Sequence, residues 1–298
     1  MCGIVGLFLK DKSLEPELGS MLTDMLITMS DRGPDSAGIA IYGGGAGGTA
    51  KLTVQSENPD QDFANLAADL STAIGAAVTL KRNDTHAVLE MPSANAAAAR
   101  QAIREAGASL RVMSDGEAIE IYKEVGLPGD VAERFNLAQM SGTHGVGHTR
   151  MATESAVTTD GAHPYSTGSD QCLVHNGSLS NHNSLRRKLV RDGVHIESEN
   201  DTEVGAAYLT WKMNKGASLG EALEASLDDL DGFFTFVVGT KDGFGVLRDP
   251  IACKPAVLAE TDQYVAFGSE YRALVSLPGI EEARVWEPEP ATVYFWNH

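Results

Sequence analysis

Residues 1–9 read MCGIVGLFL, in which Cys2 and Gly3 precede an apolar run from Ile4 to Leu9. A secretory signal would carry basic residues before such a run and a longer apolar core, so a leader is not expected. The run predicts a buried strand that starts directly after Cys2. A thiol at the edge of that strand is either a small packing residue or a positioned nucleophile.

The composition is that of an ordinary globular protein. The chain has 298 residues, 43% hydrophobic and 21% charged, and no apolar run approaches the ~20 residues of a membrane helix. Forty-one acidic against 23 basic residues give a formal charge of -18, which disfavours binding to nucleic acid or an anionic membrane. Three cysteines are too few for a disulfide framework and fit a reducing, cytoplasmic location.

Periodicity divides the chain into one domain, residues 2–298, with an insertion. Apolar residues from Leu18 to Met29 recur every three or four positions and predict a helix, and residues 37–42 predict a strand. The glycine-rich run 43–48 lacks the Lys-Ser/Thr of a phosphate loop and reads as a flexible connection.

Residues 51–128 differ in character and predict a small inserted α/β subdomain of βαββ order. Its elements are a polar helix at 63–74, a strand at 87–91, an Ala-rich helix at 93–107, and strands at 110–113 and 119–122. Beyond it, strands are expected at 144–148 and 172–175, and helices at 185–190 and 203–213. Four short strands follow, at 233–238, 245–247, 256–258 and 265–267, and suggest a second sheet. Helices beside two strand-rich blocks predict an α+β layered sandwich.

Cys2 has a chemical use if Met1 is removed. The residue then carries both a thiol and a free α-amine, whose reference pKa of about 7.7 to 8.0 lets it take the thiol proton and later return it to a leaving group. Nucleophile and base are then the same residue.

Five short motifs follow one another along the chain: MCGIVG at 1–6, RGPDSAG at 32–38, HTRMAT at 148–153, HNG at 175–177 and NDTE at 200–203. Together they resemble the signature of class II glutamine amidotransferases, the N-terminal-nucleophile type. The resemblance covers roughly residues 2–50 and 143–298, outside the insertion. It implies a four-layer αββα sandwich of the N-terminal-nucleophile hydrolase type and hydrolysis of L-glutamine to glutamate and ammonia by Cys2.

The resemblance also assigns roles within the motifs. Asn176 and the backbone N–H of Gly177 correspond to an oxyanion hole, for which donors must be in place before negative charge develops. An Asn-Gly pair can also be a plain hairpin turn. Arg150 corresponds to the clamp for the substrate carboxylate, which a guanidinium can bind through both oxygens, and Thr153 is expected beside it.

The remaining assignments each have a structural alternative. Asp201 corresponds to the acceptor of the substrate α-ammonium, but it could equally cap the following helix. His163 matches a pocket histidine of some members or is a core histidine. Arg32 and Asp35 brace the N-terminal strand or serve only the chemistry of their turn.

No metal site is expected, because His144 and His148 lie about 13 Å apart along an extended strand. Cys172 and Cys253 read as packing residues. Met151 and Glu154 depart from the commonest family pattern and leave the detailed shape of the pocket open.

Runs at 122–128 and 152–157 resemble the separately encoded glutaminase-like subunit of glutamate-synthase-like systems, of the kind found in N-methylglutamate synthase. That resemblance implies synthase partner subunits carrying flavin and iron–sulfur centres, with no cofactor in this chain. Two alternatives stay open: a hydrolase of another γ-glutamyl amide such as γ-glutamylmethylamide, and a non-catalytic glutamine-binding protein in which Met1 is retained.

Overall fold

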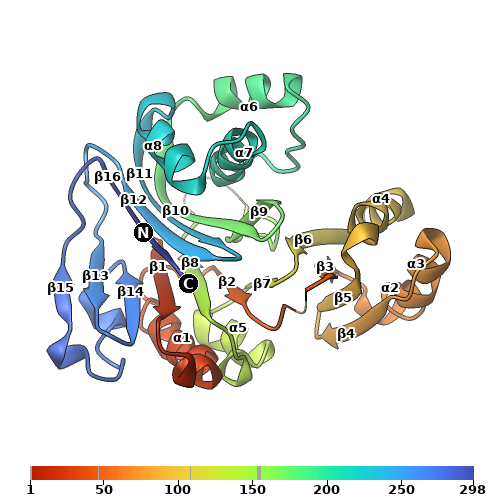
Figure 1. Cartoon of the computed structure of the whole chain (residues 1–298), viewed down its shortest axis with the longest axis horizontal. Coiled ribbons are helices and arrows are strands. Elements are labelled where there is room, and N and C mark those ends of the chain that lie inside the picture. The colour runs from red at the N-terminus through yellow and green to blue at the C-terminus, as the bar shows by residue number, and fades with distance from the viewer. Residues whose placement is uncertain (1, 46, 108, 153–155) are drawn as a thin grey trace.

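The computed structural model describes residues 2–45, 47–107, 109–152 and 156–298, whose strands form three antiparallel sheets (Figure 1). The largest sheet has seven strands in the order β15–β13–β14–β1–β8–β2–β7. Their bounds are Arg284–Trp286, Val257–Glu260, Tyr264–Gly268, Gly3–Leu9, His144–Arg150, Ser36–Tyr42 and Ile119–Val125, in the same order.

The predicted strand after Cys2 is confirmed as β1, which lies in the middle of this sheet between β14 and β8. All seven of its residues are buried. Both faces are apolar because both are covered: Val5, Leu7 and Leu9 belong to one hydrophobic cluster, and Ile4 and Phe8 to another.

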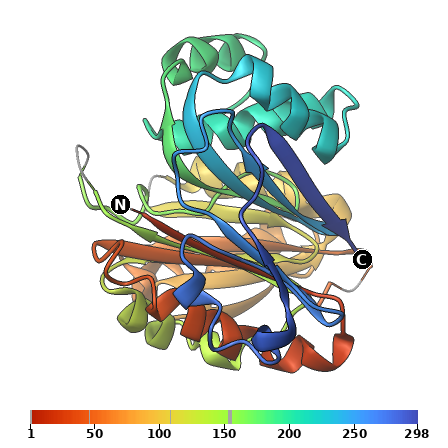
Figure 2. The same ribbon diagram turned by 90° about the vertical axis from the view of Figure 1, so that its left-hand side faces the viewer.

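The second sheet has five strands in the order β16–β12–β11–β10–β9. Their bounds are Thr292–Asn297, Gly243–Arg248, Gly232–Thr240, Gln171–Leu179 and Tyr165–Gly168. Val237 and Phe244 from this sheet pack with Ile4 and Phe8 from β1, so the two sheets lie face to face with an apolar layer between them (Figure 2). Cys172, fully buried, belongs to that layer.

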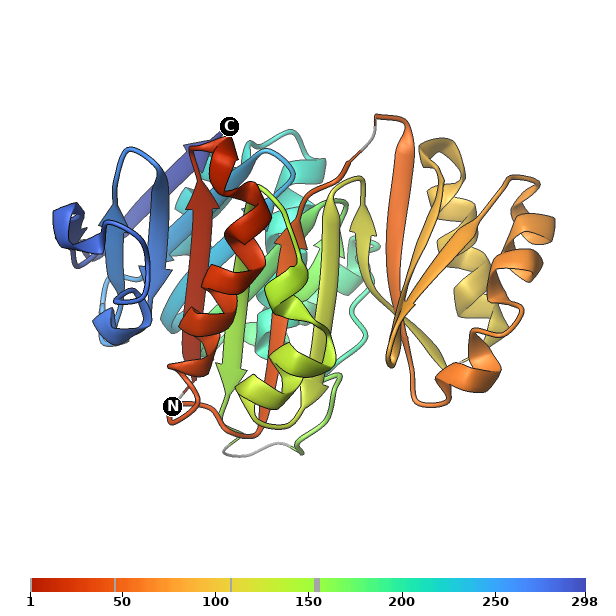
Figure 3. The same cartoon turned by 90° about the horizontal axis from the view of Figure 1, so that it is seen from below.

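Helices cover the two outer faces. The predicted helix after β1 is α1 (Leu18–Ile27), which lies with α5 (Pro128–Arg134) over the seven-stranded sheet (Figure 3). The five-stranded sheet is covered by α6 (His182–Arg191), α7 (Asp201–Asn214) and α8 (Leu219–Asp229), whose apolar side chains share a cluster with β10 and β11. Short 3-10 turns lie at Lys12–Glu17, Ser93–Asn95, Leu137–Gln139, Tyr271–Ala273 and Ile280–Glu282.

The inserted unit projects from the end of the seven-stranded sheet beside β7 (Figure 1). Its four strands have the order β4–β5–β3–β6, with bounds Thr79–Asn83, His86–Pro92, Thr49–Ser56 and Leu110–Gly116. Its helices are α2 (Pro59–Asp62), α3 (Leu66–Ile74) and α4 (Ala96–Ala106). The order is therefore βαββαβ, and the unit has a hydrophobic cluster of its own.

The structure differs from the sequence predictions in several places. The inserted sheet spans residues 49–116, and β7, predicted within the insertion, pairs with β2 in the main sheet. The late strands are divided between two sheets: β11 and β12 join β10, whereas β13 and β14 join β1. Cys253, predicted as a packing residue, is exposed. Within the described residues, the structure has no helix that is both long and apolar enough to cross a membrane.

Candidate active site

Cys2 lies directly before the first residue of β1, at the N-terminal end of the central strand of the main sheet. It is partly exposed. The next residue must be small, because a Cβ on Gly3 would lie 2.7 Å from Thr149 Oγ1 and 2.9 Å from Met29 Cβ. Because β1 is paired with β14 on one side and β8 on the other, and Gly3 is closely packed, the position of Cys2 is fixed.

The carbonyl oxygen of Cys2 accepts two side-chain hydrogen bonds from distant parts of the chain. Arg32 Nε donates at 3.0 Å and Asn176 Nδ2 at 3.3 Å. Arg32 is itself held by an ion pair of 2.6 Å from Nη1 to Glu270 Oε1, and this hydrogen bond lowers the pKa of Glu270. The next peptide is also fixed, since Ile4 N–H donates to Ser269 Oγ at 2.9 Å.

Asn176 and Gly177 come from the opposite sheet. The Asn-Gly pair is not a hairpin turn: β10 runs straight through it, with Gly177 opposite Phe234 on β11. Gly177 has φ +148°, and a Cβ there would lie 1.9 Å from Phe233 O. Asn176 is buried, and its amide nitrogen carries two hydrogens, so one can bind Cys2 while the other is offered to a ligand. The two sheets thus bring donors from β10 next to Cys2.

Arg150 ends β8, and the turn formed by residues 32–35 packs against it. Asp35 N–H donates to Arg150 O at 3.1 Å, and Asp35 Oδ2 accepts from Ala152 N–H at 2.8 Å. The Arg150 side chain is buried, and its Nη1 donates to Ala156 O at 3.3 Å. Asp35 therefore holds the segment after β8 rather than the N-terminal strand. Thr153 and Glu154 lie outside the described residues.

Asp201 opens α7, but the residue that caps this helix is Asn200, whose side chain accepts from Thr202 N–H at 2.8 Å. Asp201 Oδ2 instead accepts from Leu179 N–H at 2.9 Å, at the end of β10. Burial acts to raise the pKa of Asp201, but hydrogen bonding and charge from His175, with the Leu179 amide, lower it to about 2. An ionised carboxylate at the same end of β10 as Asn176 suits a substrate ammonium group.

A buried histidine cluster supports these residues from behind. His163 Nε2 and His175 Nδ1 lie 2.7 and 3.0 Å from the Thr202 hydroxyl, and His148 Nε2 lies 3.0 Å from His163 Nδ1 and 3.2 Å from His175 O. Burial lowers the pKa of His148 to about 3 and holds that of His163 well below its usual range, with the neighbouring histidines adding to the effect. His163 is thus a buried network residue held in its neutral form.

No sequence pattern indicates this cluster, because its members come from β8, the segment before β9, β10 and α7. His144 and His148 are four residues apart on the same strand, but their rings have different partners. His144 stacks on Tyr42 at 4.3 Å, whereas His148 faces His163. Over the residues that the structure describes, no group of three or more His, Cys, Asp or Glu side chains is arranged to hold a metal ion.

The arrangement combines a thiol-bearing residue at a strand end, amide donors from a second sheet, a guanidinium and an ionised carboxylate. Such a set can bind an amino acid by its two charged groups and stabilise negative charge on a side-chain carbonyl attacked by sulfur.

Comparisons with known proteins bear on the same residues. A family profile described as a glutamine amidotransferase domain matches residues 148–276. The glutamine amidotransferase-like protein GlxB of Rhizobium meliloti (strain 1021) is 67% identical over 299 residues, covering 100% of this chain and 99% of that protein. A putative glutamine amidotransferase of Methanothermobacter thermautotrophicus is 33% identical over 304 residues, covering 99% of each.

Among solved structures, the glutamine phosphoribosylpyrophosphate amidotransferase from B. subtilis complexed with ADP and GMP superposes with a TM-score of 0.64 at 19% identity. It covers 99% of this chain, whereas this chain spans 47% of that structure. At this identity the likeness concerns the fold alone, and it agrees with a mixed α/β architecture built on sheets.

Proposed function

This chain belongs to the class II glutamine amidotransferases and is a glutamine amidotransferase enzyme, and from that premise we propose that it is a glutaminase subunit working through a Cys2 thioester. The layers described above, helices over one sheet, a second sheet, and helices again, support assigning the fold to the four-layer αββα N-terminal-nucleophile hydrolase type.

In the proposed reaction, removal of Met1 frees the α-amine of Cys2, which takes the thiol proton. The sulfur attacks the side-chain carbonyl carbon of glutamine, and the oxyanion is held by Asn176 Nδ2 and the Gly177 N–H. Collapse breaks the C–N bond while the ammonium of Cys2 gives its proton to the amide nitrogen, which leaves as ammonia. Water then hydrolyses the thioester to glutamate and restores the thiol.

Binding is assigned to charges at the two ends of the substrate. Arg150, buried at the end of β8, takes the α-carboxylate, and Asp201, ionised with a pKa of about 2, takes the α-ammonium. Arg32 and Glu270 do not contact the substrate in this proposal: Arg32 binds the Cys2 carbonyl, and Glu270 holds Arg32 in place.

One observation carries the proposal. Cys2 is held through its carbonyl by Arg32, which follows α1, and by Asn176, which belongs to the other sheet. A packing cysteine has no need of two charged or amide donors on its own peptide. Donors converging on that peptide leave the thiol and amine of Cys2 available for chemistry.

The test is the intact mass of the protein before and after treatment with diazo-oxo-norleucine, a glutamine-analogue electrophile. Wild type should lack Met1 and gain one adduct, and Cys2→Ala should gain none. Cys253→Ala is the matched control, because Cys253 is an exposed thiol elsewhere on the surface, and its loss should leave the adduct in place. Retained Met1 with no adduct would instead favour a non-catalytic glutamine-binding protein.

We further propose that the ammonia is consumed by a partner synthase of the glutamate-synthase-like or N-methylglutamate-synthase-like type in a cytoplasmic hetero-oligomer. Flavin and iron–sulfur centres would then belong to the partners. Copurification with a flavoprotein that raises glutaminase turnover is the expected result, and turnover unaffected by any such protein would contradict it.

The second candidate function is hydrolysis of γ-glutamylmethylamide or a related amide. It is favoured by Met151, which is exposed directly after Arg150, at a position where an aromatic residue is commoner in the family. Glutamine and γ-glutamylmethylamide supplied at equal concentration distinguish the two, because faster release of methylamine than of ammonia would establish the alternative.

A further inference from the structure

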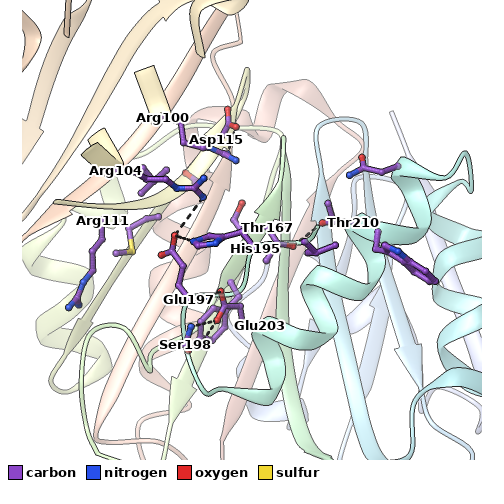
Figure 4. A pocket seen from close by; sticks show the side chains of 18 of the residues that line it. Arg100, Arg104, Arg111, Asp115, Thr167, His195, Glu197, Ser198, Glu203 and Thr210 are labelled. Carbon is purple, nitrogen blue, oxygen red and sulfur yellow. Dashed lines mark hydrogen bonds and ion pairs between the residues drawn. The ribbon is translucent and has the colours of Figure 1, made fainter. Parts of the chain in front are cut away.

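A cavity of about 730 Å³ lies between the inserted unit and the main body (Figure 4). Its walls come from α4 and β6 of the inserted unit on one side, and from β7, β9, the 192–198 segment and α7 of the main body on the other. Cys2, Arg150, Asn176, Gly177 and Asp201 are not among the described residues that line it. The cavity is therefore a separate site from the candidate glutamine site, and its volume is that of a small-molecule pocket.

The wall supplied by the insertion carries three arginines, Arg100, Arg104 and Arg111. Arg100 is paired with Asp115 of the same unit, and Arg111 with Asp160 of the main body. Arg104 is the least engaged: within the described part of the chain its ion pair with Glu197, at 3.7 Å, is its one partner. Figure 4 shows its side chain reaching from the insertion toward Glu197 and His195.

The acidic side chains of the lining have closer partners than Arg104 has. Glu203 accepts from the backbone N–H groups of Glu197 and Ser198 at 2.7 and 2.6 Å, which fixes the segment opposite Arg104. Asp192 accepts from Trp211 Nε1 at 2.9 Å. The described lining thus holds five basic and five acidic side chains in a protein of formal charge -18, and one of the basic groups, the Arg104 guanidinium, has donors to spare.

Apolar and aromatic surfaces complete the walls. Val112 and Met113 line the cavity from β6, Tyr165 from β9 and Trp211 from α7. Lys123 of β7 also lines the cavity, with Nζ 2.9 Å from Ala162 O and 4.5 Å from the Tyr165 ring centre. These surfaces suit a ligand with a carbon skeleton rather than a bare inorganic ion.

We propose that this cavity binds a small organic oxyanion, a carboxylate or a phosphate ester, whose charged group is taken by Arg104 with help from Arg111. The guanidinium fork binds two oxygens of such a group at once, and the weak pair of Arg104 with Glu197 is exchanged for the ligand. A ligand held there touches both the insertion and the main body, so it ties the two together.

Binding can be followed through Trp211, one of three tryptophans in the chain and the one that lines the cavity. We would titrate the full-length protein with succinate and, separately, with glycerol 3-phosphate at constant ionic strength. A saturable change in tryptophan fluorescence is expected with one of them, and the responding compound tells carboxylate from phosphate chemistry. Trp211→Phe should remove the signal.

Arg104→Ala should weaken binding at least about tenfold, as the loss of a charge-assisted pair predicts. Arg82→Ala is the matched control: Arg82 is also in the insertion, its side chain is 42% exposed like that of Arg104, and it is ion-paired with Asp60 away from the cavity lining. It should bind as wild type.

Equal weakening in Arg104→Ala and Arg82→Ala would overturn the proposal, as would the absence of a saturable response to either compound up to the millimolar range. The measurement does not use glutamine. Failure of the proposed glutaminase function would therefore leave this result standing, and the reverse holds as well.

Discussion

Gly177 is the residue whose backbone sets the geometry of the amide donors beside Cys2. Its φ of +148° is strained for any residue with a side chain, and a Cβ would lie 1.9 Å from Phe233 O on the paired strand. A larger residue must push β10 away from β11, and with it Asn176 away from the Cys2 carbonyl.

Gly177→Ala should therefore lower the free energy of unfolding and slow the labelling of Cys2 by the glutamine analogue. We expect a loss of about 3 kcal/mol or more in the free energy of unfolding, since backbone strain and steric overlap add together. Urea unfolding and the rate of adduct formation measure the two effects.

Gly193→Ala is the control for Gly177→Ala. Gly193 also has positive φ, +86°, but a Cβ there meets nothing within 4 Å, so only the backbone term of about 1 to 2 kcal/mol is expected. Equal effects of the two substitutions would mean that contact with Phe233 does not matter.

At the scale of elements, the inserted unit is joined to the main body through two chain segments that lie next to each other, so a deletion can remove it. Lys51 on β3 pairs with Gly116 on β6, so the chain leaves and re-enters the main body at neighbouring points. The unit has its own apolar cluster, whereas β7 remains in the main sheet.

Joining residue 48 to residue 117 should leave a main body that unfolds cooperatively and still labels at Cys2. The same deletion should abolish the oxyanion response, because Arg104 and Arg111 are lost with it. The checks are a single urea transition and the adduct mass. An aggregated or unlabelled product would show that the main body depends on the insertion, for example through Asp170, whose N–H donates to Asp115 O of the inserted unit at 2.7 Å.

The elements that the sequence predicts correctly are those with apolar residues on a buried face, such as β1 and α1. Strand β4 escapes prediction because its residues are polar and largely exposed at a sheet edge, so no alternation marks it. The strand through Asn176 is predicted to end before it, because Asn-Gly usually marks a turn and only pairing with β11 keeps it extended.

For the site, the motifs predict which residues matter but not how they touch. That Asn200 rather than Asp201 caps α7 depends on one side-chain orientation. Local spacing carries no signal for the contact of His163 and His175 with Thr202, or of His148 with His163, because this cluster joins four separate segments. The sheet that receives a given late strand is likewise decided by long-range pairing.

Over the whole molecule, buried histidines make stability depend on pH. Burial lowers the pKa of His86, His144 and His148 to about 3 and holds that of His163 well below its usual range; charge from Lys123 adds to the effect at His86. In the unfolded chain these groups titrate near 6.5, so unfolding takes up protons below that pH. A depressed histidine pKa means that stability is full above about pH 6.5 and is lost as the pH falls.

The free energy of unfolding should therefore decrease from pH 7 to pH 5, by roughly 2 kcal/mol for each such histidine. Urea titrations at pH 7, 6 and 5 measure the slope. His86→Gln should reduce the slope of the free energy of unfolding against pH by the equivalent of one proton. His195→Gln, at an exposed position, should leave that slope unchanged. A flat profile for wild type would contradict the neutral, buried state of these rings.

The central position of β1 also has a consequence for how the protein is made. Ile4 binds Ser269, 265 positions later, and β14 is the strand next to β1 in the sheet. During translation β1 leaves the ribosome before both of its partners: β8 can pair with one of its sides after residue 150, but the other side stays unpaired until residues 264–268 have been synthesised. Placing Cys2 is thus a late event of folding, and a nascent chain interrupted before β14 cannot hold its thiol in position.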